Sequence, residues 1–446
     1  MSFKYDRLYG RLTFPPIVEE LLDCPGLLRL REIGMGNVRF LAFPSFSAAT
    51  RYEHSLGVCH LADLASKSLS LCRKDRIELM IAALYHDITT PPFAHATEEL
   101  LASHYGFDHE KHFHDLITGR ATDLGGQYAQ IFGGKALKLP RLCQGPEARS
   151  LQIDLFRIPA LVFGQESERL SSVICGDVDL DNIDNVVRAA SAMGIREADG
   201  DLAEALAKSF ISYKGKEIAL SGTAHNFLEK WKTLRATLYG MILCSIDDFA
   251  LQTMLKHALR YLIETDDESI RLHEEDWKLT EQQLIERIEK HNDASRIYRR
   301  MQLRDLYDCL ALVWITGRGV LKYVENDQNQ RILESSCEKA FSATGVVNYY
   351  EDKRRRDIKR PLVFFGETRE STSPALEEPG LLLGFFTPVN RKQFDKTTKK
   401  RRPLAAQRRE FIDSLAEQLP SHFSLHQVRT LTRRGYPQLI FGDRLL

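Results

Sequence analysis

A histidine and an aspartate interrupt an apolar stretch early in the chain. His86 and Asp87 directly follow residues 77–84, which are mostly apolar and indicate a buried helix. Burying both polar side chains at the end of such a helix costs free energy unless something compensates them. A divalent cation would do so, because imidazole nitrogens and carboxylate oxygens are its usual ligands. His54 upstream and Asp181 downstream complete a candidate set of four ligands.

The elements that must position these residues are predicted to be helices. Apolar residues recur at helical spacing over residues 54–65, so His54 would lie at the start of a buried helix. Residues 76–85 form the next expected helix, and residues 170–190 return to helical spacing around Asp181. Further helices are expected over residues 203–210, 224–263 and 268–345.

The pattern changes after residue 346. Short apolar runs at residues 362–365, 381–386 and 438–441 are typical of strands. The expected fold is therefore mainly α, with an all-helical core and a smaller C-terminal α+β lobe. The predicted regions are a core over residues 1–263, a helical extension over residues 264–345 and a basic α+β lobe over residues 346–446.

Composition limits the class of protein. At 446 residues the chain exceeds the size at which single cores stop growing, so more than one domain is expected. The net charge is zero, but residues 351–446 carry 20 Lys and Arg against 12 Asp and Glu, so positive charge concentrates in the C-terminal lobe.

The cysteines and the hydropathy pattern bear on location. The eight cysteines are scattered without a C-x-x-C pair, which favours a reducing compartment over a disulfide framework. The N-terminus has no signal-peptide core, and no apolar run approaches the ~20 residues that cross a bilayer. We therefore expect a cytoplasmic protein without a membrane partner.

The motifs around the candidate ligands resemble a known family. Arg51–Val58 matches R-F/Y-E-H-S-L-G-V at every position, and His86–His95 matches H-D-x-x-H-x-P-F-x-H except at Thr90. Asp179, Asp181, Asp184 and Arg188 fit D-x-D-x-x-D-x-x-x-R. These segments resemble the dNTP triphosphohydrolase branch of the HD-domain metal-dependent phosphohydrolases, which includes bacterial dGTPases and the animal sterile-alpha-motif/HD enzyme. The likeness covers roughly residues 5–263, and no segment resembles a sterile-alpha-motif domain.

The resemblance implies a role for each matched residue. It implies an all-helical core that binds one divalent metal ion (Mn, Fe, Co, Ni, Zn or Mg) through His54, His86, Asp87 and Asp181. It implies that His95 is the acid/base group, with Glu98 as its orienting partner one helical turn away. It also implies that His109 belongs to the active site and that both His109 and Arg51 contact phosphate. Phosphoester hydrolysis needs these parts: a cation, a proton-transfer group and positive charge for the phosphate.

The chain departs from the family in the residues that recognise dNTPs. Thr90 stands where the family has another active-site His, and Asn182 and Asn185 replace a Lys and a sugar-packing Tyr. Of a V-Y-x-H-K segment that binds triphosphate, only Tyr239 is kept. Other changes fall at Met35, Pro91 and Ala189. Nearby cations that could replace the lost donors are Lys230, Lys232 and Arg235. The metal half of the motif set is intact, so we expect a nucleotide phosphohydrolase whose substrate need not be a dNTP.

Several alternatives stay open at this level. The four ligands could form a buried hydrogen-bond cluster without metal, or a metal-retaining scaffold without activity that senses nucleotide or nucleic acid. The substrate could be a phosphodiester or phosphomonoester of another nucleotide, or single-stranded nucleic acid. His95 and Glu98 could be a helix-capping pair. The basic runs at residues 353–356 and 399–402 could bind nucleic acid or a nucleotide effector, or simply be solvated. The resemblance implies a homo-oligomer, a dimer or higher.

Overall fold

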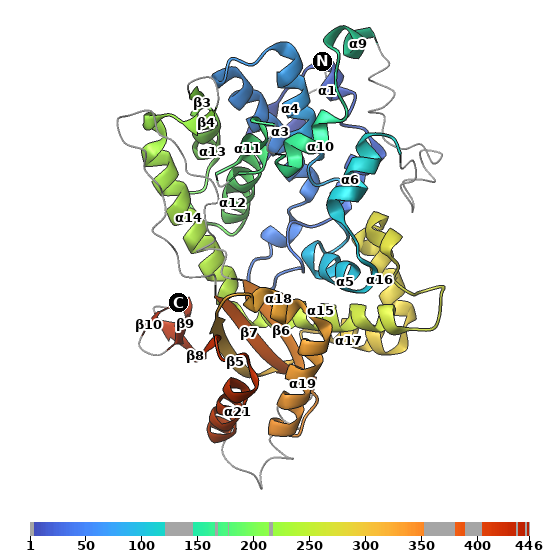
Figure 1. Cartoon of the computed structure of the whole chain (residues 1–446), viewed down its shortest axis with the longest axis vertical. Helices are drawn as coiled ribbons and strands as arrows, with labels where there is room; N and C mark the ends of the chain where they lie inside the picture. The colour runs from blue at the N-terminus through green and yellow to red at the C-terminus, as the bar shows by residue number, and fades with distance from the viewer. Residues whose placement is uncertain are drawn as a thin grey trace.

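The structure is a computed structural model in which a mainly helical part lies above a smaller part built on a β-sheet (Figure 1). It describes residues 4–120, 146–165, 168–176, 178–213, 217–351, 380–388, 404–433, 436–441 and 444–445. The mainly α fold with a smaller C-terminal α+β part confirms the predicted fold class.

Three helices form the centre of the helical part. Helix α3 (Arg51–Ser68) packs against α4 (Arg73–Tyr85) and against α12 (Leu180–Ala192). Helix α3 begins at Arg51 because Thr50 and Glu53 form a capping box, in which each side chain accepts a hydrogen bond from the other residue's backbone N–H. This cap places His54 in the first turn of the helix.

The other elements of the helical part surround these three helices. They are the hairpin β1 (Lys4–Asp6) and β2 (Gly10–Leu12), α1 (Pro16–Glu19), α2 (Pro25–Arg29), α5 (His95–Tyr105), α6 (His109–Ile117), α9 (Pro146–Leu151), α10 (Arg157–Phe163), α11 (Ser171–Ile174), α13 (Gly200–Ala207), the hairpin β3 (Phe210–Tyr213) and β4 (Glu217–Leu220), α14 (His225–Leu243), α15 (Ile246–Glu264), α16 (Glu281–Lys290) and α17 (Asn292–Gln302). The long helix α15 runs between the helical part and the sheet (Figure 1).

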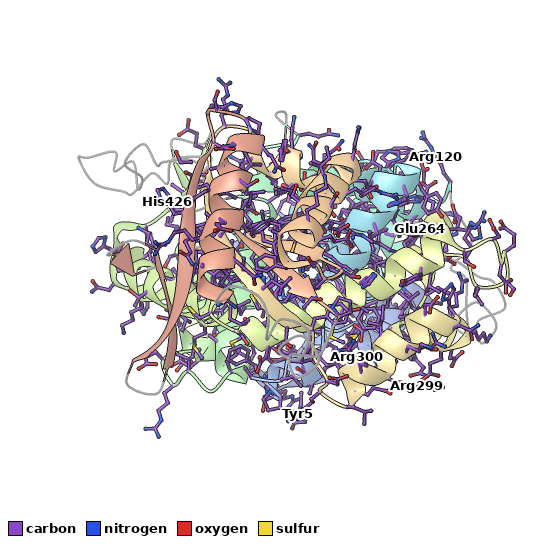
Figure 2. The ribbon with its side chains drawn as sticks, turned by 90° about the horizontal axis from the view of Figure 1, so that it is seen from below. Tyr5, Arg120, Glu264, Arg299, Arg300 and His426 are labelled. Carbon is purple, nitrogen blue, oxygen red and sulfur yellow. The ribbon has the colours of Figure 1, made fainter. Side chains whose placement is uncertain are left out.

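The C-terminal part is built on a six-stranded antiparallel sheet with the strand order β10-β9-β8-β5-β7-β6. Its elements are β5 (Asp308–Thr316), α18 (Val320–Glu325), α19 (Asp327–Phe341), β6 (Val346–Glu351), β7 (Leu381–Thr387), α21 (Leu404–Gln418), β8 (Ser424–Arg433), β9 (Tyr436–Phe441) and β10 (Arg444–Leu445). Seen from below, α19 and α21 lie side by side, with His426 of β8 beside them (Figure 2).

Strands β5 and β7, in the middle of this sheet, are buried on both faces. Leu312 and Trp314 of β5 join the core of the helical part, where Phe249 of α15 meets Phe386 of β7 with ring centroids 5.1 Å apart. Val313 and Ile315 point to the opposite face and pack in a second core with α19 and α21. The sheet is therefore the middle layer between α15 and the two C-terminal helices.

The structure corrects the expected helical extension over residues 264–345. Strand β5 lies within it at Asp308–Thr316 and pairs with β7 and β8. A strand buried on both faces has a continuous apolar run, so its sequence lacks the alternation that distinguishes a strand from a buried helix. The expected strands at residues 381–386 and 438–441 are confirmed as β7 and β9, and the one at residues 362–365 lies outside the described residues.

Candidate metal centre

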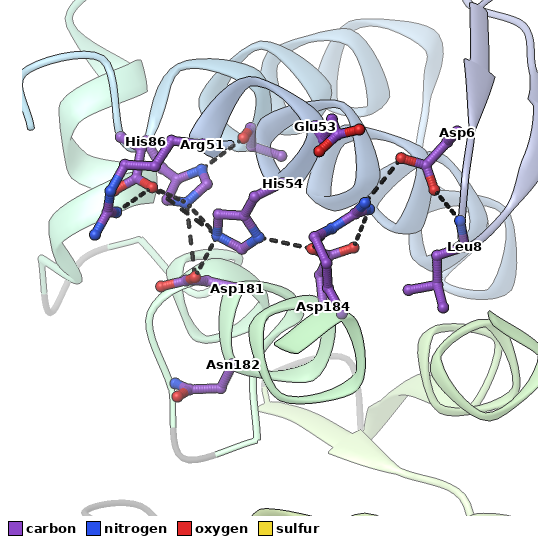
Figure 3. Close-up of polar contacts among 12 residues, drawn as sticks. Asp6, Leu8, Arg51, Glu53, His54, His86, Asp181, Asn182 and Asp184 are labelled. Carbon is purple, nitrogen blue, oxygen red and sulfur yellow. Dashed lines mark hydrogen bonds and ion pairs between the residues drawn. The ribbon is translucent and has the colours of Figure 1, made fainter. Parts of the chain in front are cut away.

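Side chains from three elements meet at one point. His54 comes from the first turn of α3, His86 and Asp87 follow the last residue of α4, and Asp181 lies in the first turn of α12 (Figure 3). His54 Nε2 is 2.9 Å from Asp181 Oδ1 and 3.2 Å from His86 Nε2. Asp87 Oδ2 lies 3.6 Å from His86 Nε2 and 4.0 Å from His54 Nε2. The four residues predicted as metal ligands thus converge.

The outer nitrogens of both imidazoles are already engaged. His54 Nδ1–H donates to Asp184 Oδ1 at 2.7 Å, and His86 Nδ1–H donates to the Ala83 carbonyl at 2.8 Å. Such hydrogen bonds fix the tautomer and leave the Nε2 atoms to bind a cation. Two imidazole nitrogens and two carboxylates that face one another are a donor set suited to one divalent cation. Among the described residues, His54, His86 and Asp181 also form the one geometrically defined group of potential metal ligands.

The electrostatic environment favours positive charge at this point. Burial lowers the pKa of His54, but its hydrogen bonds to Asp181 and Asp184 outweigh burial and raise the pKa to about 9. Burial raises the pKa of Asp87, yet Arg51 and the two histidines hold it well below its usual range. The carboxylates that favour a proton on His54 would also attract a divalent cation. A cation and a proton therefore compete for Nε2 of His54.

Arg51 and Thr90 fix the orientation of Asp87. Arg51 Nη1 donates to Asp87 Oδ2 at 2.6 Å, and the Thr90 hydroxyl donates to Asp87 Oδ1 at 3.0 Å. Thr90, which stands where the family has a His, therefore positions a ligand. The neighbouring hydroxyl of Thr89 lies 3.0 Å from His109 Nδ1.

A buried arginine holds the loop between α4 and α5. Arg29 is 1% exposed, and its guanidinium donates to the carbonyls of Ile88 and Thr90 on one side and of Trp277 and Leu279 on the other. The loop ends in two residues with positive φ, Phe93 and Ala94, a conformation that surrounding contacts must maintain. Residues 264–302 thus help to shape the loop that carries Asp87.

The predicted acid/base pair sits at the start of α5. His95 Nδ1 and Glu98 Oε2 are 3.0 Å apart, and the His95 side chain is 59% exposed. Burial raises the pKa of Glu98, but the hydrogen bond to His95, together with the charges of His109 and Arg51, lowers it below its usual value. Glu98 is therefore a carboxylate oriented toward a histidine that solvent can reach.

Comparison with known proteins identifies the domain that carries these motifs. Residues 51–126 match the HD domain family, a segment that contains His54, His86, Asp87, His95 and His109. This chain carries an HD domain. The match covers the segment that carries most of the predicted motifs, and it confirms the predicted likeness to HD-domain proteins in that segment. Asp181 lies outside the matched segment. Because α12 packs against α3, Asp181 nevertheless lies beside the residues of the HD domain.

Relatives match the chain to different extents. An uncharacterised protein of Methanocaldococcus jannaschii is 25% identical over 345 residues, which are 74% of this chain and 65% of the relative. The deoxynucleoside triphosphate triphosphohydrolases SAMHD1 of Bos taurus and Homo sapiens are 35% and 34% identical over 97 residues, 20% of this chain and 16% and 15% of the relatives. The similarity therefore spans less than two thirds of each of these relatives and, in the triphosphohydrolases, only the region of the HD domain.

A solved structure shares the fold over most of the chain. The crystal structure of a hypothetical protein from Aquifex aeolicus superposes with a TM-score of 0.61 and 20% identity, and covers 89% of this chain and 99% of its own. This likeness concerns the fold alone. In the part of the chain that the structure describes, no helix combines the length and apolar character required to span a bilayer.

The residues expected to contact substrate lie on two helices beside the HD domain. On α12 the amide of Asn182 donates to Asp179, which caps the helix, and the side chain points away from the ligand cluster (Figure 3). Asn185 is half-buried one turn after Asp181. Helix α14 packs against α12 and carries Lys230, Lys232, Arg235 and Tyr239.

Some contacts on α14 join neighbouring side chains of the same helix. Lys230 is exposed, Lys232 Nζ donates to Glu229 at 2.9 Å, and the Arg235 guanidinium lies 5.2 Å from the ring centroid of Tyr239. Their role toward substrate stays a prediction.

Sequence reasoning missed the residues behind His54. The motif match placed Asp184 on the same helix as Asp181 without giving it a partner, and the structure shows that it accepts the Nδ1–H of His54. Asp184 is itself bound by Arg188 and Tyr9. A signal was present in the sequence, because Asp184 and Arg188 are spaced for an ion pair along one helix face.

Gly57 explains how this network fits against α3. A Cβ there would lie 2.2 Å from Asp184 Oδ2 and 2.4 Å from Arg188 Nη2, so glycine permits the approach of α12. The glycine in the middle of α3 was a second signal of a close contact.

Proposed function

We propose that this HD-domain protein is a metal-dependent phosphohydrolase that acts on nucleotides. A dNTP, cleaved to a deoxynucleoside and triphosphate, is the first candidate substrate. The observation that carries the proposal is the convergence of His54, His86, Asp87 and Asp181, with both imidazole Nδ1 atoms engaged elsewhere. The matches to deoxynucleoside triphosphate triphosphohydrolases over the HD domain support the choice of substrate class.

The chain's own residues divide the chemistry among them. When bound by the four ligands, a divalent cation makes phosphorus more electrophilic and an attacking water more acidic. His95 transfers a proton at its exposed Nε2, while Glu98 holds Nδ1. Arg51, fixed by Asp87, and His109, fixed by Thr89, face phosphate oxygens and stabilise the negative charge that develops there.

A second candidate substrate follows from the surroundings of Asp181. The Asn182 amide is engaged by Asp179, and Thr90 is engaged by Asp87. Neither supplies the donor that the family residue at its position would supply to a dNTP. A phosphomonoester or phosphodiester of another nucleotide, or single-stranded nucleic acid, would need fewer such donors. A non-catalytic scaffold that binds nucleotide or nucleic acid is the alternative from another class of function.

The proposal extends to organisation and partners. We propose that residues 1–263 form the catalytic unit and that residues 264–302 stabilise its loop through Arg29. Self-association as a dimer or higher homo-oligomer is proposed from the resemblance. Binding of nucleic acid or a nucleotide effector is proposed for the basic runs at residues 353–356 and 399–402, which lie outside the described residues.

One experiment tests the activity. The purified protein is supplied with Mn²⁺ and incubated with one substrate at a time. The substrates are dNTPs, NTPs, nucleoside monophosphates, cyclic dinucleotides and single-stranded oligonucleotides. Released triphosphate, pyrophosphate and phosphate are then quantified. We expect release that chelation abolishes and that the double variant His86→Ala/Asp87→Ala lacks.

A matched variant separates the loss of chemistry from the loss of folding. Glu334 of α19 is a half-buried carboxylate in the C-terminal part that accepts a hydrogen bond from Arg260 at 2.8 Å. Glu334→Gln should lower stability yet retain phosphate release. Unchanged release by His86→Ala/Asp87→Ala would exclude the proposed enzyme, and metal binding without release from any substrate would favour the scaffold.

A further inference from the structure

The carboxylate of Asp184 accepts four hydrogen bonds. Oδ1 accepts from His54 Nδ1 at 2.7 Å and from Arg188 Nε at 2.8 Å. Oδ2 accepts from the Tyr9 hydroxyl at 2.6 Å and from Arg188 Nη2 at 3.0 Å. Asp184 is fully buried, so these four donors replace all of its solvent. Its orientation, and with it that of the His54 ring, is fully determined by them.

Two of the residues that complete this network come from the first ten of the chain. Tyr9 lies in the turn between β1 and β2, 175 positions before Asp184. Asp6 is the last residue of β1, and its Oδ2 accepts a hydrogen bond from Arg188 Nη1 at 2.9 Å (Figure 3). Asp6 Oδ1 accepts from the backbone N–H groups of Leu8 and Tyr9, which fixes the turn that presents the phenol.

The charge of the connected network matches a divalent cation. Its carboxylates are Asp6, Asp87, Asp181 and Asp184, and its guanidiniums are Arg51 and Arg188. Both imidazoles are neutral once they bind a cation, so the four negative and two positive side chains then leave a net charge of two negative. Without Asp6 the net charge would be one negative. Arg188 would then have Asp184 as its one carboxylate partner in this network, and its positive charge would offset that of Asp184 more fully.

We propose that Asp6 and Tyr9 are positioning residues of the metal centre, which act on His54 through Arg188 and Asp184. The hairpin β1–β2 is then part of the site although it contributes no ligand. Tyr9 fixes the angle of the Asp184 carboxylate. Asp6 neutralises part of the positive charge of Arg188, so that more of the negative charge of Asp184 acts on His54. This inference rests on the proposed metal site and predicts an effect on the affinity for the cation, which a purely structural ion pair would not have.

The test measures binding of Mn²⁺ alone to metal-free protein by calorimetry, at a temperature where circular dichroism shows each variant to be folded. Tyr9→Phe keeps the ring and removes the hydroxyl, and Asp6→Asn keeps the shape and removes the charge. We expect each to weaken Mn²⁺ binding about tenfold, at the lower end of the effects of residues that orient metal ligands. Asp6→Glu should restore part of the loss, because it restores the charge.

A control and a double-mutant cycle complete the test. Glu334→Gln removes a half-buried carboxylate bound by Arg260 in the C-terminal part and should leave Mn²⁺ affinity unchanged. In an Asp184→Asn background, Tyr9→Phe should have little further effect, because its only route to His54 has gone.

The outcomes distinguish this inference from the function on which it rests. If the wild-type protein binds no Mn²⁺, the proposed metal site fails. If it binds Mn²⁺ and both Tyr9→Phe and Asp6→Asn bind as tightly, only the positioning role is overturned. A full tenfold effect of Tyr9→Phe in the Asp184→Asn background would also overturn it, because the effect would then follow another route.

Discussion

The ligand region of α3, α4 and α12 differs from the neighbouring face of α14 in how its charges are held. In the ligand region each charged side chain is fixed by another element: His54 by Asp184, Asp87 by Arg51, and Arg188 by Asp6. On α14 two of the contacts lie within the helix itself: Lys232 binds Glu229, and Arg235 stacks on Tyr239. The two helices α12 and α14 are in contact, so the difference arises within one small volume.

The comparison separates two kinds of functional surface. A buried network tolerates little change. Removing one partner leaves another charge unpaired and lowers the free energy of unfolding by roughly 3–5 kcal/mol. An exposed helix face loses at most about 1 kcal/mol per ion pair. If the ligand region activates phosphate and the α14 face contacts the rest of the substrate, as proposed, the first can stay constant while the second varies. The sequence has this pattern, because the residues of the ligand region match the family motifs and those expected to contact the rest of the substrate depart from them.

The largest effect is expected for His86. Replacing His86 by Ala removes one imidazole ligand and leaves Asp87 with one positive neighbour fewer, so metal binding should be lost. Phosphate release should fall by more than about 1000-fold, since a catalytic cation contributes several kcal/mol. Metal content and initial rates, measured on the same preparation, check this. A variant that keeps both would place the cation elsewhere.

A somewhat smaller effect is expected for His95. His95→Gln removes the exposed proton-transfer group but none of the ligands. The turnover rate should fall about 100-fold to 1000-fold, as for other general acids and bases, while Mn²⁺ affinity stays that of the wild type. Glu98→Gln should give a weaker loss in the same direction. A wild-type rate for His95→Gln would assign this pair to helix capping.

Metal removal should lower the stability of the folded protein. At a free Mn²⁺ concentration 100 times the dissociation constant, binding stabilises the folded state by about 2.7 kcal/mol. Chelation should therefore lower the thermal midpoint by about 5–11 °C, since 1 kcal/mol corresponds to about 2–4 °C for a domain of this size. The Asp181→Asn variant should show no such response. Differential scanning fluorimetry with and without chelator measures both, and an equal response of the variant would contradict the ligand assignment.

The smallest effect is expected on α14. The double variant Lys230→Ala/Lys232→Ala removes two solvent-facing cations and no buried partner. We expect KM for the best nucleotide to rise about 3-fold to 10-fold with kcat unchanged, because exposed charge pairs contribute at most about 1 kcal/mol each. Steady-state kinetics check this. A loss of kcat as large as that of His95→Gln would show that α14 takes part in the chemistry and would break the comparison.

The sequence was sufficient to predict those parts of the site that lie within continuous motifs. His54 lies in the first turn of α3, and His86 and Asp87 follow the end of α4, as the apolar spacing predicts. The family resemblance then predicted Asp181 as the fourth ligand, and the geometry brings all four together. The roles of His95, Glu98 and His109 stay predictions, although His95 and Glu98 do form the expected pair.

Other parts could not be predicted because they depend on contacts between distant segments. Strand β5 was expected to be helical, since burial on both faces of the sheet removes the alternating pattern. Arg29 gave no sign of its role, because its partners are backbone carbonyls of residues 88, 90, 277 and 279. A carbonyl group is common to every residue type, so no side-chain pattern marks it.

The amino-acid sequence by itself determined which atoms can bind a cation and roughly where along the helices they lie. Ligand chemistry belongs to residue types, and helix ends are set by local caps and spacing. Only the tertiary structure decided which nitrogen of His54 faces the other ligands. That choice depends on Asp184, Arg188, Tyr9 and Asp6, which converge from both ends of the first 188 residues. Hydrogen bonds over such separations exist only once the helices have packed, so the orientation of the metal centre is a property of the fold.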